Sequence, residues 1–321
     1  MTIKEQVLKI LIDNKEKSVS GEAIADQLFC SRNAVWKAIK SLRNEGYKID
    51  AVTNKGYSLV DDGGVFSSVS VEKRLKNDCR VIVLENVDST NNYLKKLAEN
   101  GERENTVVIA ECQSSGKGRL GRSFFSPKSG LYMSILLRPT FSAEKSLFIT
   151  AAAAVAVSDA IEEISGKTTG IKWVNDVFIG NKKVCGILTE AAVDFETGGL
   201  YYAIPGIGVN IYHPADGFPP EIRDIAGAVF DTEPDEKDLK QKLAAAIINN
   251  FFDIYNNIES SDFMQKYKQK SCILGKEIFV LRNETKTKAT VLDIDEKAGL
   301  VVKYENGEVE TLSSGEVSIR L

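Results

Sequence analysis

The sequence is poor in several residue types on which catalytic and structural sites often depend. Its one histidine, His213, precedes a proline in a polar segment and is typical of a solvated loop. A catalytic triad or a histidine-ligated metal is therefore a weak hypothesis. The five cysteines are odd in number, scattered, and nowhere form a Cys-x-x-Cys pair. That pattern indicates free thiols in a reducing cytoplasm and argues against a zinc or disulfide framework.

Long apolar runs are lacking as well. The longest, 151–157, is far shorter than the roughly 20 residues that a bilayer demands, and the first residues form no basic-then-apolar leader, so no export is expected. With 7 prolines among 321 residues and 43% hydrophobic residues, the chain is neither disordered nor fibrous. The net charge of −4 argues against a protein that coats nucleic acid with its whole surface. The length favours two or three domains.

Residues 1–65 predict a winged helix-turn-helix domain. Three short helices are expected, the second capped by Ser20 and the third by Ser31. A β-hairpin follows, and its turn holds Asn54 and Lys55. Helix, tight turn, helix and hairpin in this order are the pattern of winged DNA-binding domains.

Local charge supports DNA binding in this segment. Between residues 31 and 57 there are six basic and two acidic residues, in a protein that is acidic as a whole. The alternative is a merely solvated, lysine-rich helix face, but the hairpin and the turn spacing favour DNA. Trp36 is expected in the core rather than at the DNA. The candidate DNA-binding residues are Ser31, Arg32, Asn33, Lys37, Lys40 and Lys55.

The rest of the chain predicts an α+β protein with two further domains. Residues 66–270 alternate strand-like and helical stretches, and hairpin-like connections favour a mixed, largely antiparallel sheet. Residues 271–321 hold five short strand-like runs, which predict a small β-barrel. Strands are expected at 80–84, 106–111, 131–137, 177–179, 184–189 and 201–209, helices at 91–99, 145–164 and 237–258, and the last five strands at 277–281, 287–292, 300–304, 309–312 and 317–321.

A loop at 116–122 combines glycines with cations. The glycines satisfy G-x-G-x-x-G, but no helix is predicted after them, so a dinucleotide fold does not fit. A P-loop does not fit either, because Arg122 stands in place of the lysine and a strand follows. The segment is therefore predicted to be a flexible loop. Its backbone amides and cations favour binding of a phosphate or carboxylate over the alternative of a basic loop that is only solvated.

Other polar clusters are ambiguous when each is taken alone. The Asp-Ser-Thr-Asn run at 88–91 precedes a helix and could be an ordinary N-cap. Lys183 follows a hairpin turn, where lysines are usually solvated. The Gly-x-Gly-x-Asn run at 206–210 could admit a ligand or form a bulged strand.

Taken together, the clusters resemble a known family. Ser-Thr-Asn, Gly-Lys-Gly-Arg-x-Gly-Arg, Lys-Trp-x-Asn-Asp, Lys-x-x-Gly-Ile-Leu and Gly-x-Gly-x-Asn follow one another as in biotin protein ligases. With the winged helix in front, nearly the whole chain is similar to bifunctional ligases that also repress the biotin operon. The resemblance implies a class II synthetase-like central domain and an SH3-like C-terminal barrel. Lys117 stands where the family usually has arginine, and Val174 where it usually has proline.

The resemblance also implies an activity. Biotin would be activated with Mg-ATP to biotinyl-5′-adenylate and transferred to a lysine of a biotin carboxyl carrier protein. The adenylate would favour a homodimer that places two winged helices on a palindromic operator and represses genes of biotin synthesis and transport. Two alternatives stay open, namely a lipoate-type ligase with the same chemistry and a DNA-binding biotin sensor without turnover.

Residue roles carry over from the same resemblance. The biotin-binding residues would be Ser89, Thr90, Asn91, Gln113, Gly116, Lys117, Gly118, Arg119, Lys183 and Gly186. The residues that bound ATP or the adenylate would be Arg119, Arg122, Phe124, Asn175, Asp176 and Asn210. Lys183 and Arg119 would be catalytic, since cations offset the repulsion between a carboxylate and a triphosphate. Asp176 is a candidate Mg²⁺ ligand.

Overall fold

The structure is a computed structural model that describes residues 2–14, 17–52, 55–61, 63–194, 196, 198–260, 262–282, 285–313 and 316–319. The chain divides into two compact units. The first comprises Met1–Arg74 and Asp235–Lys242, and the second comprises Leu75–Pro234 and Leu243–Leu321.

The first unit is a helix-turn-helix with a two-stranded wing. Its elements are α1 (Ile3–Asp13), α2 (Gly21–Gln27), α3 (Arg32–Asn44), β1 (Lys48–Val52), β2 (Gly56–Asp61) and α4 (Ser68–Glu72). Ser20 and Ser31 cap α2 and α3, since their hydroxyls accept from the amides of Ala23 and Ala34 at 3.0 and 3.1 Å. β1 and β2 pair antiparallel. The predicted winged helix-turn-helix is confirmed, while Asn54 of its predicted turn lies outside the described residues.

The core of this unit is built from the inward faces of its helices. In α3 the residues Val35, Ala38, Ile39 and Leu42 are buried at helical spacing. Trp36 is 51% exposed, so its expected place in the core is wrong. Each helical residue turns by about 100°, which carries the residue after Val35 out of the buried stripe and into solvent.

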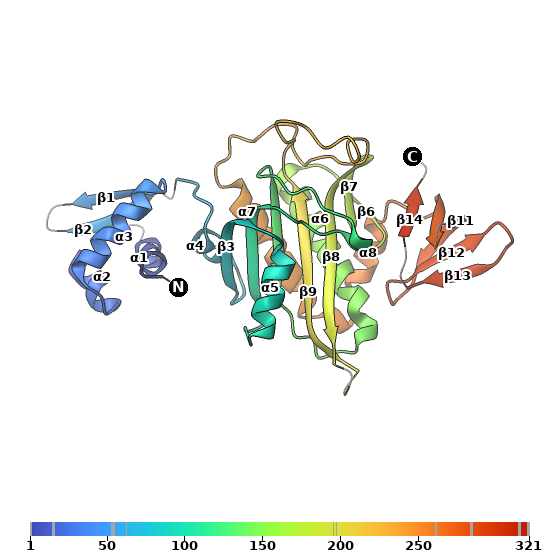
Figure 1. Ribbon diagram of the computed structural model, residues 1–321, viewed down its shortest axis with the longest axis horizontal. Helices are drawn as coiled ribbons and strands as arrows, with labels where there is room; N and C mark the ends of the chain where they lie inside the picture. The colour runs from blue at the N-terminus through green and yellow to red at the C-terminus, as the bar shows by residue number, and fades with distance from the viewer. Residues whose placement is uncertain are drawn as a thin grey trace. The chain divides into compact units, whose positions relative to one another are not determined.

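The second unit is built on a seven-stranded sheet in the order β3-β4-β5-β9-β8-β7-β6 (Figure 1). Its strands are β3 (Arg80–Val87), β4 (Thr106–Gln113), β5 (Gly130–Ile135), β6 (Gly170–Lys172), β7 (Asp176–Ile179), β8 (Lys182–Val193) and β9 (Leu200–Asn210). β3 and β4 are parallel, and the other neighbours are antiparallel. This confirms the mixed, largely antiparallel sheet. The sequence did not predict β6, whose three residues are too few to show a period.

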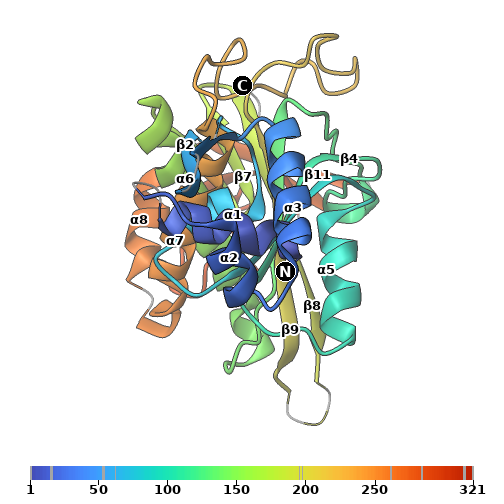
Figure 2. The same ribbon diagram turned by 90° about the vertical axis from the view of Figure 1, so that its left-hand side faces the viewer.

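Helices cover both faces of this sheet. α5 (Thr90–Glu99) packs on one face, and α6 (Ser146–Ser165), α7 (Leu239–Tyr255) and α8 (Phe263–Lys270) lie on the other (Figures 1 and 2). α6 is apolar around most of its circumference, as a helix buried between a sheet and other helices must be. Among the described residues, none of the helices has the length and apolar character needed to cross a membrane.

The C-terminal part of the second unit is an antiparallel sheet of five strands in the order β13-β12-β11-β10-β14. They are β10 (Glu277–Arg282), β11 (Thr285–Ile294), β12 (Leu300–Tyr304), β13 (Val309–Leu312) and β14 (Glu316–Ile319). The five predicted strands are present, although residues 320–321 of the last one lie outside the described part. No pairing joins β13 to β14 within the described residues, so this sheet is open there rather than closed into a barrel.

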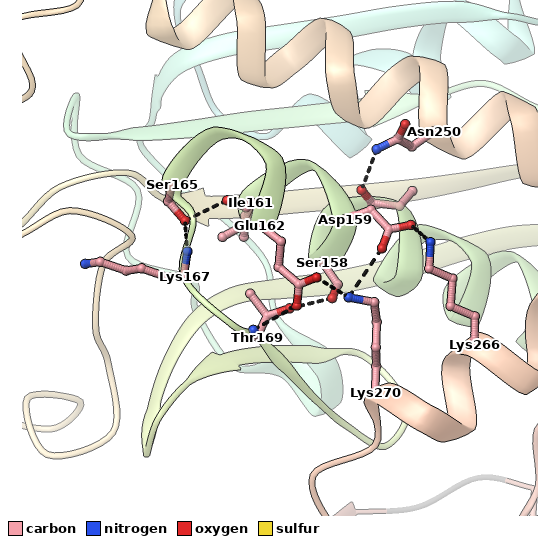
Figure 3. Close-up of polar contacts among 11 residues, drawn as sticks. Ser158, Asp159, Ile161, Glu162, Ser165, Lys167, Thr169, Asn250, Lys266 and Lys270 are labelled. Atoms are coloured by element: carbon pink, nitrogen blue, oxygen red, sulfur yellow. Dashed lines mark hydrogen bonds and ion pairs between the residues drawn. The ribbon is translucent and has the colours of Figure 1, made fainter.

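A polar network ties α8 to α6 and to the segment that enters β6 (Figure 3). Glu162 accepts hydrogen bonds from the Thr169 amide and hydroxyl at 2.9 and 2.8 Å and from Lys270 Nζ at 2.6 Å. Lys270 also lies 3.3 Å from Asp159. The network therefore anchors the start of β6, whose other end leads into the polar run at 172–176.

We expect Glu162→Gln to lower the free energy of unfolding at pH 7 by about 1 to 3 kcal/mol, since it weakens charge-assisted hydrogen bonds. Burial raises the pKa of Glu162, but the hydrogen bonds from Lys270 and Thr169 outweigh it and hold the pKa below its usual value. A lowered carboxyl pKa stabilises the fold above the unfolded value, and this contribution is lost as pH falls through the folded pKa. Urea unfolding of both proteins should therefore show a difference that shrinks in acid. The exposed neighbour Glu163→Gln is the control, and an undiminished difference at acid pH would contradict the assignment.

Candidate functional site

A cavity of about 360 Å³ lies in the second unit, against the sheet. Every residue predicted to bind biotin or the adenylate lines it, except Gly116. These residues come from the start of α5, the cationic loop, the turn before β7, and strands β8 and β9. The structure thus brings together side chains that are more than 100 positions apart in the sequence.

One end of the cavity is a closed, neutral and polar corner. Ser89, Thr90 and Asn91 are each at most 5% exposed, and Ser89 is at the same time the N-cap of α5. The Gln113 side-chain oxygen accepts from the Thr90 amide at 2.9 Å and from its hydroxyl at 3.1 Å, while Gln113 Nε2 donates to Ser126 at 3.0 Å. Fixed uncharged donors and acceptors suit a neutral polar group such as a urea, rather than an ion.

Asn91 is held rigidly in this corner. Its amide nitrogen donates to Glu190 Oε2 at 2.8 Å, and its oxygen accepts from the Ser134 hydroxyl at 2.6 Å. A Cβ at position 206 would lie 2.2 Å from Asn91 Oδ1. Gly206 is therefore needed because Asn91 occupies the space above it, and not because the chain bulges there.

The cationic loop is tied to both sides of the cavity. Lys117 Nζ donates to Asn92 Oδ1 on α5 at 2.6 Å, and Arg119 Nη1 donates to Asn175 Oδ1 at 3.1 Å. The loop continues as a single 3-10 turn, Arg119–Gly121, and then as extended chain. This confirms that neither a P-loop nor a dinucleotide-binding turn is present at these residues.

The Phe124 ring forms an apolar wall between two glycines. A Cβ at Gly208 would lie 2.5 Å from ring carbon Cε1, and a Cβ at Gly186 would lie 2.9 Å from Cε2. Tyr132 meets the ring edge-on, with centroids 6.3 Å apart. The small residues of β8 and β9 thus make room for this ring, which can pack against a flat or aliphatic ligand.

The other end of the cavity is charged. Lys183 Nζ lies 2.7 Å from Asp176 Oδ1, and both side chains are more than two-thirds buried. Asn210 is 8% exposed and donates through Nδ2 to the Gly227 carbonyl at 2.9 Å. Neutral donors at one end and cations with one carboxylate at the other suit an elongated ligand with an uncharged head and an anionic tail.

The alternation of strand β8 decides which of two adjacent lysines faces the cavity. Lys183 lines it, whereas Lys182 Nζ donates to the carbonyls of Arg223 and Asp224 at 3.1 and 2.8 Å. Successive strand residues point to opposite sides, so these two side chains diverge. The expectation that a hairpin lysine is solvated is therefore wrong for Lys183, while Lys182 is exposed and bound to two backbone carbonyls.

Two later segments of the chain support the run at 172–176. Trp173 is 3% exposed, and its indole nitrogen donates to the Ala298 carbonyl at 2.8 Å. The fully buried Tyr267 donates its hydroxyl to the Val174 carbonyl at 3.1 Å. Neither contact could be predicted from the sequence, because the partners are more than 90 positions apart.

One wall of the cavity was not predicted from the sequence. Phe218, Ile222 and Ile225 line it from the irregular segment after β9. The Lys183 amide donates to the Ile225 carbonyl at 2.8 Å, which fixes this wall against β8. Irregular chain has no periodicity, so hydrophobic pattern could not assign these residues to a site.

The cavity offers neither an activated thiol nor a ready-made metal centre. Cys185 of β8 is not among the residues that line the cavity, and burial raises the pKa of its thiol, which disfavours a nucleophilic thiolate. Among the described residues, no three histidine, cysteine, aspartate or glutamate side chains gather as metal ligands do. The arrangement fits chemistry that depends on positioning and on fixed charge.

The second candidate interface lies on the first unit. The predicted DNA-binding residues Ser31, Arg32, Asn33, Lys37 and Lys40 are all exposed, at the start of α3 or along its outer face. Lys55 is exposed just before β2 of the wing. The predicted residues of α3 and the wing are therefore accessible to a partner.

Three family descriptions match the chain. Residues 83–210 match the biotin/lipoate A/B protein ligase family, residues 4–58 match a helix-turn-helix domain, and residues 273–320 match the biotin protein ligase C-terminal domain. The three matches follow the order of the winged helix, the seven-stranded sheet and the five-stranded sheet.

Curated relatives and solved structures agree with these matches. The chain is 38% identical to the bifunctional ligase/repressor BirA of Bacillus spizizenii over 70% of each chain, and 25% identical to that of Salmonella typhimurium over 99% of this chain and 98% of the relative. It is also similar to a biotin protein ligase from Aquifex aeolicus in complex with biotin and ATP, with TM-score 0.60, 31% identity, and coverage of 77% and 99% of the two chains. The chain therefore belongs to the biotin/lipoate A/B protein ligase family.

Proposed function

We propose that the protein activates biotin with ATP to biotinyl-5′-AMP and transfers biotin to a lysine of a biotin carboxyl carrier protein. The main support for this proposal is the distribution of charge along the cavity, which has uncharged polar side chains at one end and charged ones at the other. The neutral corner of Ser89, Thr90 and Gln113 suits the uncharged ureido group of biotin, and Lys183 and Arg119, which also line the cavity, would contact its carboxylate and the ATP phosphate. The biotin protein ligase from Aquifex aeolicus, which was solved with biotin and ATP, supports the choice of biotin.

In this proposal the carboxylate oxygen of biotin attacks the α-phosphorus of ATP, and pyrophosphate leaves. The carrier lysine then attacks the resulting mixed anhydride, and AMP leaves. Both steps bring anions together or spread charge over phosphate oxygens, so fixed cations contribute most of the catalysis. Lys183 is the leading candidate for this role, and Arg119 and Arg122 follow from the loop. Phe124 would pack beside the adenylate and help to exclude water from the anhydride.

Magnesium would enter with the triphosphate. Mg²⁺ is commonly held by one or two carboxylates together with substrate phosphates, and Asp176 fits as one such ligand next to Lys183. The ion would reduce the repulsion between the two anionic substrates. Asn175 and Asn210 would bound the adenylate on the same side.

Pyrophosphate exchange into ATP tests the proposed activity. We expect exchange with biotin and none with lipoate or without an acid. Exchange with lipoate instead would move the protein to the lipoate-type alternative while keeping the chemistry. No exchange with either acid would make a DNA-binding sensor without turnover the leading alternative.

We further propose that the protein represses biotin synthesis and transport genes as a homodimer that forms when the adenylate is bound. The exposed basic face of α3 supports DNA binding, and the relatives named ligase/repressor support the regulatory role. The domains are proposed as 1–65, 66–270 and 271–321, and the location as the cytoplasm, in keeping with five cysteines that are all free. Band shifts on the promoter of the organism's biotin genes that do not respond to biotin plus ATP would count against repression.

Arg119→Gly should still adenylate biotin, because Lys183 remains in place, but it should release free biotinyl-adenylate roughly tenfold faster than wild type, because the bond from Arg119 to Asn175 is lost. Free adenylate in the medium during turnover is the measurement. Arg119→Lys keeps the charge and should release less than the glycine variant. If the glycine variant released no more adenylate than wild type, Arg119 would not retain the intermediate.

A further inference from the structure

The outer face of α3 carries an aromatic residue among its polar ones. Trp36 is 51% exposed, although burying an indole is normally favourable. Arg32 and Lys40 lie one helical turn before and after it, Asn33 lies three residues before it on the same side, and Lys37, the next residue, is also exposed. The tryptophan is thus in the middle of the predicted DNA-binding surface.

A contact within the helix orients this ring. Lys40 Nζ lies 5.3 Å from the centre of the Trp36 ring, within the range of a cation–π interaction. The exposed indole is therefore partly ordered before any partner binds, and less conformational entropy is lost on binding. The other tryptophan of the chain, Trp173, is 3% exposed and cannot play this part.

The positive charge on the exposed face of α3 indicates which kind of partner this face binds. Arg32 and Lys40 lie one turn to either side of Trp36, Lys37 is the exposed residue that follows it, and Lys55 is exposed just before β2. A purely apolar protein surface would leave these cations without partners, whereas a duplex offers both phosphates and base edges. In the major groove, the 5-methyl group of thymine is the apolar feature that a helix can contact.

We propose that Trp36 is a base-reading residue, whose indole packs against a thymine methyl group in the major groove while the neighbouring cations bind phosphates. The inference rests on the proposed DNA binding of this unit and assigns sequence preference to a residue that the basic pattern alone would not select. Lys37 and Lys40 would then contribute affinity and salt dependence, and Trp36 would contribute discrimination.

The test uses the full chain with biotin and Mg-ATP, and duplexes that the wild-type chain selects from a random-sequence library. We expect Trp36→Ala to weaken binding to the selected duplex roughly 5- to 30-fold, as expected for loss of a base contact, with an almost unchanged salt dependence. Lys37→Ala is the matched control, and it should weaken binding to all duplexes alike and reduce the salt slope by about one.

Replacing single thymines by uracil isolates the methyl group. At one position in each half-site the wild type should lose several-fold in affinity, whereas Trp36→Ala should lose nothing further. Trp36→Phe, which keeps an apolar ring, should retain part of the difference. Since the residue is exposed, all these variants should fold, and thermal melts check this.

The outcomes distinguish a failure of DNA binding by the protein from a failure of the role proposed for Trp36. If the wild type selects and binds no duplex, DNA binding fails and the role of Trp36 fails with it. If the wild type binds but Trp36→Ala binds equally well, only the role of Trp36 is overturned. If no uracil substitution affects the wild type, or if Trp36→Ala weakens binding to all sequences equally, base reading by this residue is overturned.

Discussion

Lys183→Met should reduce biotin-dependent pyrophosphate exchange about 10²- to 10³-fold, the usual loss when one group that stabilises transition-state charge is removed. Methionine keeps much of the length and apolar volume of the lysine, so the cavity should remain. The ammonium that lies 2.7 Å from Asp176 would be missing where charge develops on the phosphate. We expect the maximal rate to fall far more than the apparent affinity for biotin. The uncharged head of biotin would bind at the opposite end of the cavity from Lys183, so its contacts should be unchanged.

Lys182→Met is the matched control for this prediction. It is the adjacent residue of the same strand, but its ammonium contacts the carbonyls of Arg223 and Asp224. Exchange by this variant should remain within a few-fold of wild type. Equal losses in the two variants would mean that general charge, and not the place of Lys183, matters for the reaction.

Gly206→Ala should raise the KM for biotin more than tenfold and lower the free energy of unfolding by about 1 to 3 kcal/mol, as expected for overpacking. The added Cβ would lie 2.2 Å from Asn91 Oδ1 and 2.8 Å from its Cγ. Asn91 cannot yield easily, because it is 5% exposed and bonded to both Ser134 and Glu190. Denaturant unfolding and initial rates against biotin concentration measure the two effects.

Combining this change with Asn91→Ala tests its cause. The smaller side chain removes the overlap, so the added methyl group should cost less stability in the Asn91→Ala background than in wild type. Biotin binding should stay weak, because the polar corner is still incomplete. Equal costs in both backgrounds would show that Gly206 matters for another reason than the space above it.

Local sequence was sufficient for most of the helices and strands that hold the site motifs. Ser20 and Ser31 cap helices that their spacing predicts, and the motifs lie where strands end or helices begin. Short elements such as β6 escaped prediction because three residues carry no period. Trp36 was misplaced because a large apolar side chain predicts burial, whereas the rotation of α3 places it outside the buried stripe.

The site itself was only partly predictable. Adjacent motif residues could be identified, but the reason for Gly206 and Gly208 appears only when Asn91 and Phe124 are placed above them. Phe218, Ile222 and Ile225 come from irregular chain, which no periodicity marks. Long-range contacts such as Trp173 with Ala298 depend on the folded topology and are invisible to any local pattern.

The contacts of the run at 172–176 have a consequence for the order of events during synthesis. Trp173 and Val174 are held by Ala298 and Tyr267, so this side of the site lacks its supports until the last part of the chain has left the ribosome. Chains emerge at about 5 to 20 residues per second, and earlier parts fold first. The basic helix α3 is therefore complete well before the site can hold a reactive anhydride. An unfinished chain therefore has its helix α3 before it has a site that could form and release biotinyl-adenylate.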